Sequence, residues 1–425
     1  MAYLEQRRNL WYATLTIPED VRHWFDGKRK FVQSTQTSDK RLAQSKAHAL
    51  VLEWKAQIEE ARGNTGNDFN ALEWALEAKK TLESTSDNSA NEALYFGFME
   101  ALERRFPDEI EKLSGVITGT RTPFGGHVDE WLKSLDISQK TIHQRERDLK
   151  LFTTRLHTVQ EITGVSVRSL LVELTKPESE GGKGYGLSSL KRVTGAARSY
   201  WEYLQELELA PIELQPFIVP RSLVKSKQVR ENATRTGKRK PFSGEDLRRL
   251  RRASLDKGDE TLADLILLGA YTGARIAELC SIKLVDASTE LLVINESKTE
   301  AGVRQVPVHS ELVNTISRLI DSSSDGYLLS GLSTNNQYGD RSTAIGKRFG
   351  RLKTELGYGK EYVFHSTRHT FTTAARSADK TELGYKKVIG HADTGGGVSD
   401  GYTHELPMER LKEVVEGVKY GINWD

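Results

Sequence analysis

The chain has 425 residues, of which 37% are hydrophobic and 28% are charged, and its net charge is +2 at pH 7. This is the composition of a globular protein with enough apolar residues for a sizeable core, and the length suggests roughly two to four domains. No apolar run approaches the roughly 18 residues of a membrane span, and no apolar stretch follows the N-terminal arginines as in a secretory signal. The single cysteine, Cys280, excludes a disulfide framework or a multi-cysteine zinc module. We therefore expect a soluble multidomain protein inside the cell.

Residues 1–62 are predicted to form a small N-terminal domain of strands and one helix. The aromatic and β-branched run at residues 10–17 favours a strand, and residues 29–35 favour another. A helix is predicted over residues 40–61, because residues 37–39 carry side chains that can cap its start. Such a sheet can lie in a DNA groove, but a protein-interaction module has the same pattern.

Residues 63–121 are predicted to be an acidic helical spacer. They hold 11 acidic and 6 basic residues, and their periodicity favours helices over 70–82 and 92–106. No residue pattern there indicates chemistry, so a spacer or an assembly surface is expected.

Residues 122–220 are predicted to form a helical domain, with helices over 123–135, 141–156 and 188–207. The second and third helices carry basic residues that suit phosphate contacts, although a solvated helix face has the same pattern. The candidate DNA-binding residues of this domain are Lys140, Arg145, Lys191 and Arg192.

Residues 221–240 are predicted to be a basic interdomain linker. Residues 221–241 hold 8 basic residues and one acidic residue, without apolar periodicity before Pro241. Such a segment can lie along a phosphate backbone between two domains, or it can be a solubilising tether. Its candidate DNA-binding residues are Lys238, Arg239 and Lys240.

Residues 241–425 are predicted to form the domain that carries the chemistry. The apolar run at residues 261–271 indicates a buried helix. Residues 291–297 and 303–308 alternate in polarity on either side of a polar turn at 299–302, which predicts a β-hairpin.

Four short segments of this domain together contain the residue types that phosphodiester transfer to a tyrosine requires. Arginine clamps non-bridging phosphate oxygens, and a tyrosine hydroxyl, whose pKa is about 10, can form a covalent intermediate after losing its proton. Lysine or histidine can protonate the departing oxygen. The segments are residues 272–279 with Arg275, residues 297–299 with Lys298, residues 365–371 with His365, Arg368 and His369, and residues 389–391 with His391, followed by Tyr402.

Other chemistry fits these segments less well. His365 and His369 have the i, i+4 spacing of a metal pair, but Arg368 beside them disfavours a cation, and no glutamate lies between them as in zinc proteases. Ser366 and Cys280 have no paired base and acid nearby that would make either a nucleophile. Each segment taken alone also fits salt bridges and packing.

Together the four segments resemble those of the tyrosine recombinases, specifically phage-type or mobile-element integrases. Residues 272–279 resemble the first-arginine motif of that family, residues 365–368 its His-x-x-Arg motif, and residues 389–391 its Leu-Gly-His motif. Residues 402–404 resemble the segment with the nucleophile, and the resemblance extends over about residues 122–425.

The resemblance assigns roles in catalysis. Tyr402 would attack the scissile phosphate and form a 3′-phosphotyrosyl bond, leaving a free 5′-hydroxyl. Arg275 and Arg368 would bind the non-bridging oxygens, and Lys298 would protonate the leaving 5′-oxygen. No metal, ATP or other cofactor is implied.

The remaining roles concern protons and orientation. The resemblance implies that His365 assists proton transfer at the nucleophile and that His391 donates a hydrogen bond to the phosphate. Glu278 either orients its neighbours or is structural.

One spacing departs from the family pattern. The tyrosine usually lies nine residues after the histidine, whereas Tyr402 lies eleven residues after His391. The glycine-rich stretch 393–397 can loop out the extra length. Tyr385 and Tyr420 are the nearest rivals, and neither is followed by Thr-His.

The resemblance implies a multidomain, mainly α fold with small β-sheets (α+β). Residues 241–425 would be the tyrosine recombinase catalytic domain, residues 122–220 a helical, SAM-like core-binding domain, and residues 1–62 a domain that binds arm-type DNA sites. The linker would close a C-shaped clamp around duplex DNA. The amphipathic tail at residues 408–420 would pack on a neighbouring subunit, or else on its own domain.

The partners implied are double-stranded attachment sites and further copies of the chain, as a homotetramer on two synapsed sites in the bacterial cytoplasm, at the nucleoid when bound. The sequence leaves open whether a host DNA-bending protein and an excision factor take part. The leading hypothesis is an integrase that inserts and excises a mobile element. A dimer-resolving recombinase of the Xer type, a type IB topoisomerase and a catalytically decayed DNA-binding regulator are the alternatives.

Overall fold

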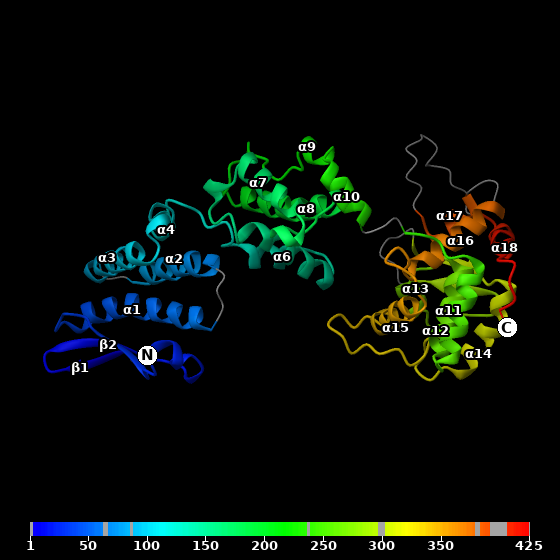
Figure 1. Ribbon diagram of the computed structural model, residues 1–425, viewed down its shortest axis with the longest axis horizontal. Helices are drawn as coiled ribbons and strands as arrows, with labels where there is room; N and C mark the ends of the chain where they lie inside the picture. Colours follow the sequence, from blue (N-terminus) through cyan, green and yellow to red (C-terminus); the bar gives the residue numbers. More distant parts are fainter. Residues whose placement is uncertain are drawn as a thin grey trace. The chain divides into compact units, whose positions relative to one another are not determined.

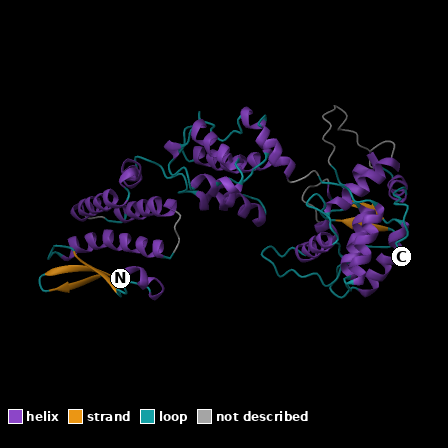
Figure 2. Ribbon diagram, viewed as in Figure 1, coloured by secondary structure: helices purple, strands orange, loops and turns teal. Residues whose placement is uncertain are grey.

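The computed structural model describes residues 3–62, 67–85, 88–235, 239–295, 302–378, 383–391 and 406–424. The chain divides into two compact units, Met1–Ala233 and Thr234–Asp425. Helices predominate in both units, and each also contains a small β-sheet (Figure 2). None of the helices in the described part of the chain is long and apolar enough to span a membrane.

The N-terminal unit begins with a three-stranded antiparallel sheet in the order β1-β2-β3. One face of the sheet packs on helix α1 (Figure 1). Strands β2 and β3 and helix α1 correspond to the predicted strands and helix. Ala13 is fully buried in this interface, and Phe31 stacks on Trp54 at a centroid distance of 5.4 Å. The elements are β1 (Leu4–Arg7), β2 (Leu10–Thr16), the 3₁₀ helix η1 (Glu19–Phe25), β3 (Lys30–Ser34) and α1 (Lys40–Ala61).

The acidic helices that follow share a core with α1. Trp74 and Phe98 lie edge to face at 5.8 Å, and Ala49 of α1 belongs to the same buried cluster. The predicted spacer is therefore packed onto the N-terminal sheet-and-helix layer. Its elements are α2 (Asn67–Glu83), α3 (Asn88–Arg105), η2 (Pro107–Glu109) and α4 (Ile110–Ile117).

The predicted helical domain has a core of large aromatic residues. Phe217 stacks on Phe124 at 6.0 Å and meets Phe152 edge to face at 5.3 Å, and Trp201 is fully buried beside it. The elements are α5 (Val128–Ser134), α6 (Gln139–Thr153), η3 (Val159–Glu161), α7 (Gly164–Thr175), η4 (Glu178–Glu180) and α8 (Leu187–Glu206).

The predicted flexible linker is in large part folded, which corrects the expectation for residues 221–240. Helices α9 (Arg221–Val224) and α10 (Lys227–Arg235) bury Leu223 and Val229 against the helical domain. Asn232 is also buried, and its Nδ2 donates hydrogen bonds to the carbonyl oxygens of Thr175 at 2.8 Å and Tyr185 at 3.1 Å. Lys238 lies outside the described residues.

The C-terminal unit is built around α12 (Glu260–Thr272), which is buried along almost its whole length, as predicted. Helices α11, α15 and α16 pack around it, and the predicted hairpin forms with Ile294 paired to Arg304 (Figure 1). The other elements are α11 (Gly244–Asp256), α13 (Ile276–Cys280), η5 (Leu284–Asp286), β4 (Leu291–Ile294), β5 (Arg304–Pro307), η7 (Ser310–Leu312), α14 (Val313–Ser322), α15 (Ser342–Glu355), α16 (His365–Ala378), α17 (Leu383–Ile389) and α18 (Met408–Glu416).

The C-terminal tail packs on its own unit. Helix α18 buries Val414 and Val415 in the core, against α17 and β5. Beyond it, the Tyr420 hydroxyl donates to the carbonyl oxygen of Ala270, and Trp424 Nε1 donates to the hydroxyl oxygen of Tyr271 at 2.9 Å. The apolar side of the tail is therefore covered within one chain.

The tail contact should contribute directly to the stability of the C-terminal unit. We expect Trp424→Ala to lower the free energy of unfolding of this unit by about 3 kcal/mol, because it removes a buried indole and its hydrogen bond. Thermal denaturation at several protein concentrations measures the effect, which should not depend on concentration. Trp24→Ala, at a side chain that is 66% exposed, is the matched control. A loss that disappears at high concentration would instead indicate packing between chains.

Candidate functional site

The turn that presents Arg275 depends on Gly273. Gly273 ends α12 with a φ of +60°, a left-handed conformation that glycine adopts without steric cost. A Cβ at this position would also overlap the ring of Phe371 on α16. The turn places Arg275 at the N-cap of α13, as the sequence predicts, with its side chain 40% exposed.

Glu278 is a buried carboxylate that binds two arginines. Its Oε1 accepts a hydrogen bond from Arg275 Nη1 at 2.5 Å, and its Oε2 accepts from the Arg275 backbone N–H and from Arg304 Nη2, both at 2.9 Å. Burial alone would raise the pKa of Glu278, but the hydrogen bond and charge of Arg304, and the hydrogen bonds of Arg275, hold this pKa below its usual value. The carboxylate is therefore ionised at neutral pH and holds both guanidiniums.

Arg368 brings a third guanidinium to the same place. It lies one turn after His365 on α16, its side chain is buried, and its Nη1 donates to the carbonyl oxygen of Gly273 at 3.0 Å. Burial and then the charges of Arg275 and Arg304 lower the pKa of Arg368 to about 10, still far above neutral pH. Its Nη2 is buried and has no hydrogen-bond partner among the described residues. A bound anion could accept a hydrogen bond from this buried, positively charged group.

His365 begins α16, with its ring edge-on to His369 at a centroid distance of 5.2 Å. Desolvation, and then the positive charges of His369, Arg368 and Arg275, lower the pKa of His365 to about 4. The ring is therefore neutral at pH 7 and can accept a proton. In the described ranges, no group of three or more His, Cys, Asp and Glu side chains is placed to hold a metal ion.

His391 follows α17 at a second left-handed glycine, Gly390, whose φ is +65°. Desolvation, and then the charges of Arg368 and Arg275, lower the pKa of His391. Because the same two arginines act on both histidines, the structure brings together four of the predicted site residues. These are Arg275, His365, Arg368 and His391. Lys298 and Tyr402 lie outside the described residues.

The candidate DNA-binding residues have different surroundings. Arg192 forms an ion pair with Asp148, which is only 3% exposed, so that part of its role is structural. Arg145 Nη1 donates to Ser199 Oγ at 3.1 Å. Lys140, Lys191, Arg239 and Lys240 are exposed, with Arg239 donating to the carbonyl oxygen of Lys360 and Lys240 pairing with Glu361.

Sequence reasoning missed Arg304. This arginine begins β5, with a side chain only 6% exposed, and it completes the pair of guanidiniums on Glu278. Its place at the start of an alternating strand gave no sign of burial, since polar residues at strand ends are usually exposed. Only the fold brings β5 to α13.

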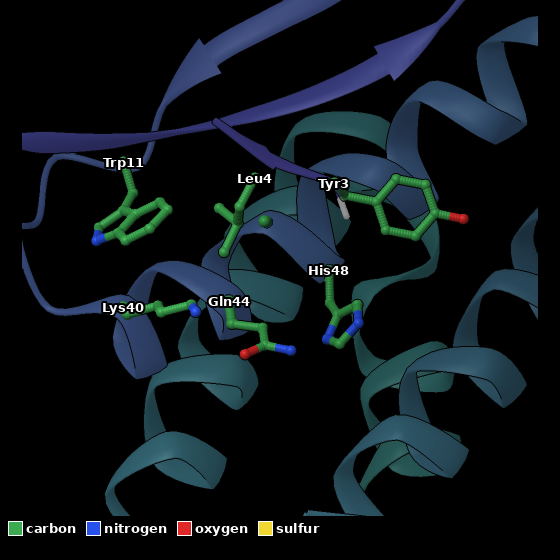
Figure 3. Close-up of a pocket in the computed structure, with 7 residues that line it drawn as sticks. Tyr3, Leu4, Trp11, Lys40, Gln44 and His48 are labelled. Carbon is green, nitrogen blue, oxygen red and sulfur yellow. The ribbon is translucent and has the colours of Figure 1, made fainter. Parts of the chain in front are cut away.

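A separate cavity of about 350 Å³ lies in the N-terminal unit. Figure 3 shows Tyr3, Leu4 and Trp11 on its strand side and three polar side chains from α1 opposite them. These three are Lys40, Gln44 and His48. The cavity contributes no residue to the charged cluster of the C-terminal unit.

Comparisons with known proteins bear on both units. Residues 240–406 match the profile of the phage integrase family, and residues 3–63 match that of a domain of unknown function (DUF6538). A solved structure of the Tn1549 transposon integrase in complex with transposon right end DNA has a TM-score of 0.50 and 19% sequence identity, covering 64% of this chain and 92% of that one. A comparison with curated protein sequences gave no match.

Two lambda integrase structures are also similar. A dimer bound to a COC′ core site has a TM-score of 0.49 and 18% identity, covering 69% of this chain and 84% of that one. A tetramer bound to a Holliday junction has a TM-score of 0.49 and 16% identity, covering 94% of this chain and 98% of that one.

Most of the C-terminal unit thus matches the phage integrase family, and its fold resembles that of the transposon integrase. Residues 240–406 form a domain of the phage integrase family, the tyrosine recombinases, as the four sequence segments indicate. The matched range includes all six candidate catalytic residues. The predicted fold class, mainly helical with small β-sheets, is confirmed.

The depressed pKa of His365 has a measurable consequence. The folded protein should take up this proton only near pH 4, whereas the unfolded chain takes it up near pH 6.5. Folding stability from this residue is therefore complete above about pH 6.5 and declines as the pH falls toward 4. NMR titration of labelled histidines, assigned with His365→Gln, measures the midpoint. A midpoint at 6.5 or above would contradict the charged environment described here.

Proposed function

We propose that this protein is a site-specific DNA recombinase of the integrase type, which cleaves and rejoins DNA through a 3′-phosphotyrosyl intermediate. One observation carries the proposal: Arg368 and Arg275 converge from different helices, and Arg368 keeps a buried donor without a partner among the described residues. A phosphodiester supplies the negatively charged oxygens that such donors bind.

The charge of the site favours an anion over a cation. Of the three guanidiniums in the site, Arg275 and Arg304 donate to the carboxylate of Glu278, whereas Arg368 donates to the carbonyl oxygen of Gly273. The depressed pKa of Arg368 and His365 reflects the mutual repulsion of these charges as well as burial. A phosphate gains extra negative charge on its non-bridging oxygens during transfer, so this cluster stabilises the transition state more than the ground state.

The reaction then needs one nucleophile and two proton transfers. The Tyr402 oxygen attacks the scissile phosphorus, and neutral His365 assists removal of its proton. The P–O5′ bond breaks as the P–O bond to tyrosine forms, and Lys298 protonates the leaving 5′-oxygen. His391 donates a hydrogen bond to the phosphate. Attack by a 5′-hydroxyl on the phosphotyrosine reverses these steps and rejoins the strands without an external energy source.

The other parts of the chain supply DNA contacts in this proposal. Residues 122–220 are the core-binding domain, with exposed Lys140 and Lys191 on helices α6 and α8. Residues 1–62 bind arm-type sites, and residues 63–121 connect the two. The DNA partners are duplex attachment sites of a mobile element, recombined by a homotetramer.

The nucleophile can be tested by covalent trapping. We expect Tyr402→Phe to abolish the covalent adduct with nicked duplexes from the DNA flanking the gene, while leaving DNA affinity nearly unchanged, because only the attacking oxygen is lost. Denaturing gels and peptide mapping measure the adduct, and gel shifts measure affinity. Tyr338→Phe is the matched control. An adduct that persists in Tyr402→Phe would refute the assignment.

The phosphate clamp can be tested at Arg368. We expect Arg368→Ala to slow strand cleavage by about 100- to 1000-fold, as the loss of one charge-stabilising donor does in other enzymes. Single-turnover cleavage of the trapping duplex measures the rate. Arg376→Ala, two turns further along the same helix, should cleave at the wild-type rate. Equal rates for Arg368→Ala and the wild type would exclude the clamp role.

A further inference from the structure

Arg304 contacts two distant segments of the C-terminal unit and a residue just before its own strand. Its Nε donates to the carbonyl oxygen of Val388 at 2.6 Å, its Nη1 to that of Gly302 at 2.7 Å, and its Nη2 to Glu278 Oε2 at 2.9 Å. A guanidinium is planar and its donor directions are fixed, so these bonds hold the three acceptors in one arrangement.

Each of the three acceptors is close in sequence or in space to a candidate catalytic residue. Glu278 holds the Arg275 side chain through its other carboxylate oxygen, at 2.5 Å. Val388 lies at the end of α17, shortly before His391. Gly302 follows directly after the part of the β4–β5 connection that includes Lys298 in the sequence.

Arg304 also limits how far Glu278 neutralises Arg275. Because one carboxylate binds two guanidiniums, the group of Glu278, Arg275 and Arg304 has a net positive charge. The Arg304 side chain is 6% exposed and the Arg275 side chain is 40% exposed, so the member accessible to an anion is Arg275. Without the Arg304 cation, Glu278 would cancel the charge of Arg275 on its own.

We propose that Arg304 is a positioning residue, which holds Arg275, Gly302 and the end of α17 in the arrangement that strand cleavage requires. Its effect on cleavage rests on the proposed function. Arg304 itself does not touch the phosphate. Its contribution is therefore to the rate of cleavage and to the local geometry, and not to DNA affinity.

The test compares Arg304→Lys with Arg341→Lys in the full chain. Lysine keeps the charge but offers one ammonium in place of a three-way fork. Arg341 is the matched control, because it is also largely buried and donates to Cys280 O at 2.9 Å, to Leu329 O at 2.8 Å and to Asp325 at 3.1 Å. Denaturation first establishes the fraction of each variant that is folded.

The first readout is the pKa of His391 in the free protein, measured by NMR of labelled histidines. If Arg304 positions the end of α17 and Arg275, the pKa of His391 should rise toward 6.5 in Arg304→Lys and stay unchanged in Arg341→Lys. Equal His391 titrations in the wild type and both variants would overturn the inference. This readout needs neither DNA nor phosphate.

The second readout is phosphate binding and cleavage. We expect inorganic phosphate to raise the pKa of His365 and His391 in the wild type, and Arg304→Lys to cleave the trapping duplex about 100-fold more slowly with unchanged DNA affinity. Similar cleavage rates for the two lysine variants would overturn the inference. If phosphate leaves both histidines unchanged in the wild type, the proposed function fails, while the free-protein titration still decides the role of Arg304.

Discussion

The ionised, buried carboxylate of Glu278 is the interaction on which the site depends. Three guanidiniums drawn together in a poorly solvated place repel one another, and Glu278 binds two of them directly. It also accepts from the backbone N–H of Arg275, which fixes the start of α13. The fold around it, from the glycine turn after α12 to the strand that carries Arg304, brings these partners within reach.

The candidate catalytic segments could be recognised because each one is local in the sequence. Arg275 and Glu278 lie within one helical turn, and so do His365 and Arg368, so that spacing alone indicates a shared face. The contact between Glu278 and Arg304 could not be predicted, because it joins a helix to a distant strand. The alternation of polar and apolar residues in a strand predicts which face of the strand is buried. It does not predict which buried acidic residue an arginine at the end of the strand will contact.

The surfaces that cover two other segments, helices α9 and α10 and the C-terminal tail, could not be predicted for a related reason. Leu223 and Val229 are too few among basic residues to produce visible periodicity, and their burial depends on a surface supplied by the helical domain. The amphipathic pattern of the tail correctly predicted a helix with an apolar face. Amphipathicity does not state which surface covers that face, and here Trp424 and α18 are covered by their own unit. Local pattern therefore defines the elements, whereas their docking depends on shapes far away in the chain.

The buried Nη2 of Arg368, without a partner among the described residues, makes the free C-terminal unit less stable than its packing allows. In the proposed function, a bound phosphodiester would satisfy this donor in the folded state only, and it would shift the folding equilibrium toward the native form. An apolar residue of similar shape at position 368 would make the domain more stable, but it would remove the donor that the proposed function needs. The proposal therefore implies that resistance to heat and to proteolysis is greatest in the DNA-bound protein, and that the DNA-free chain is degraded faster.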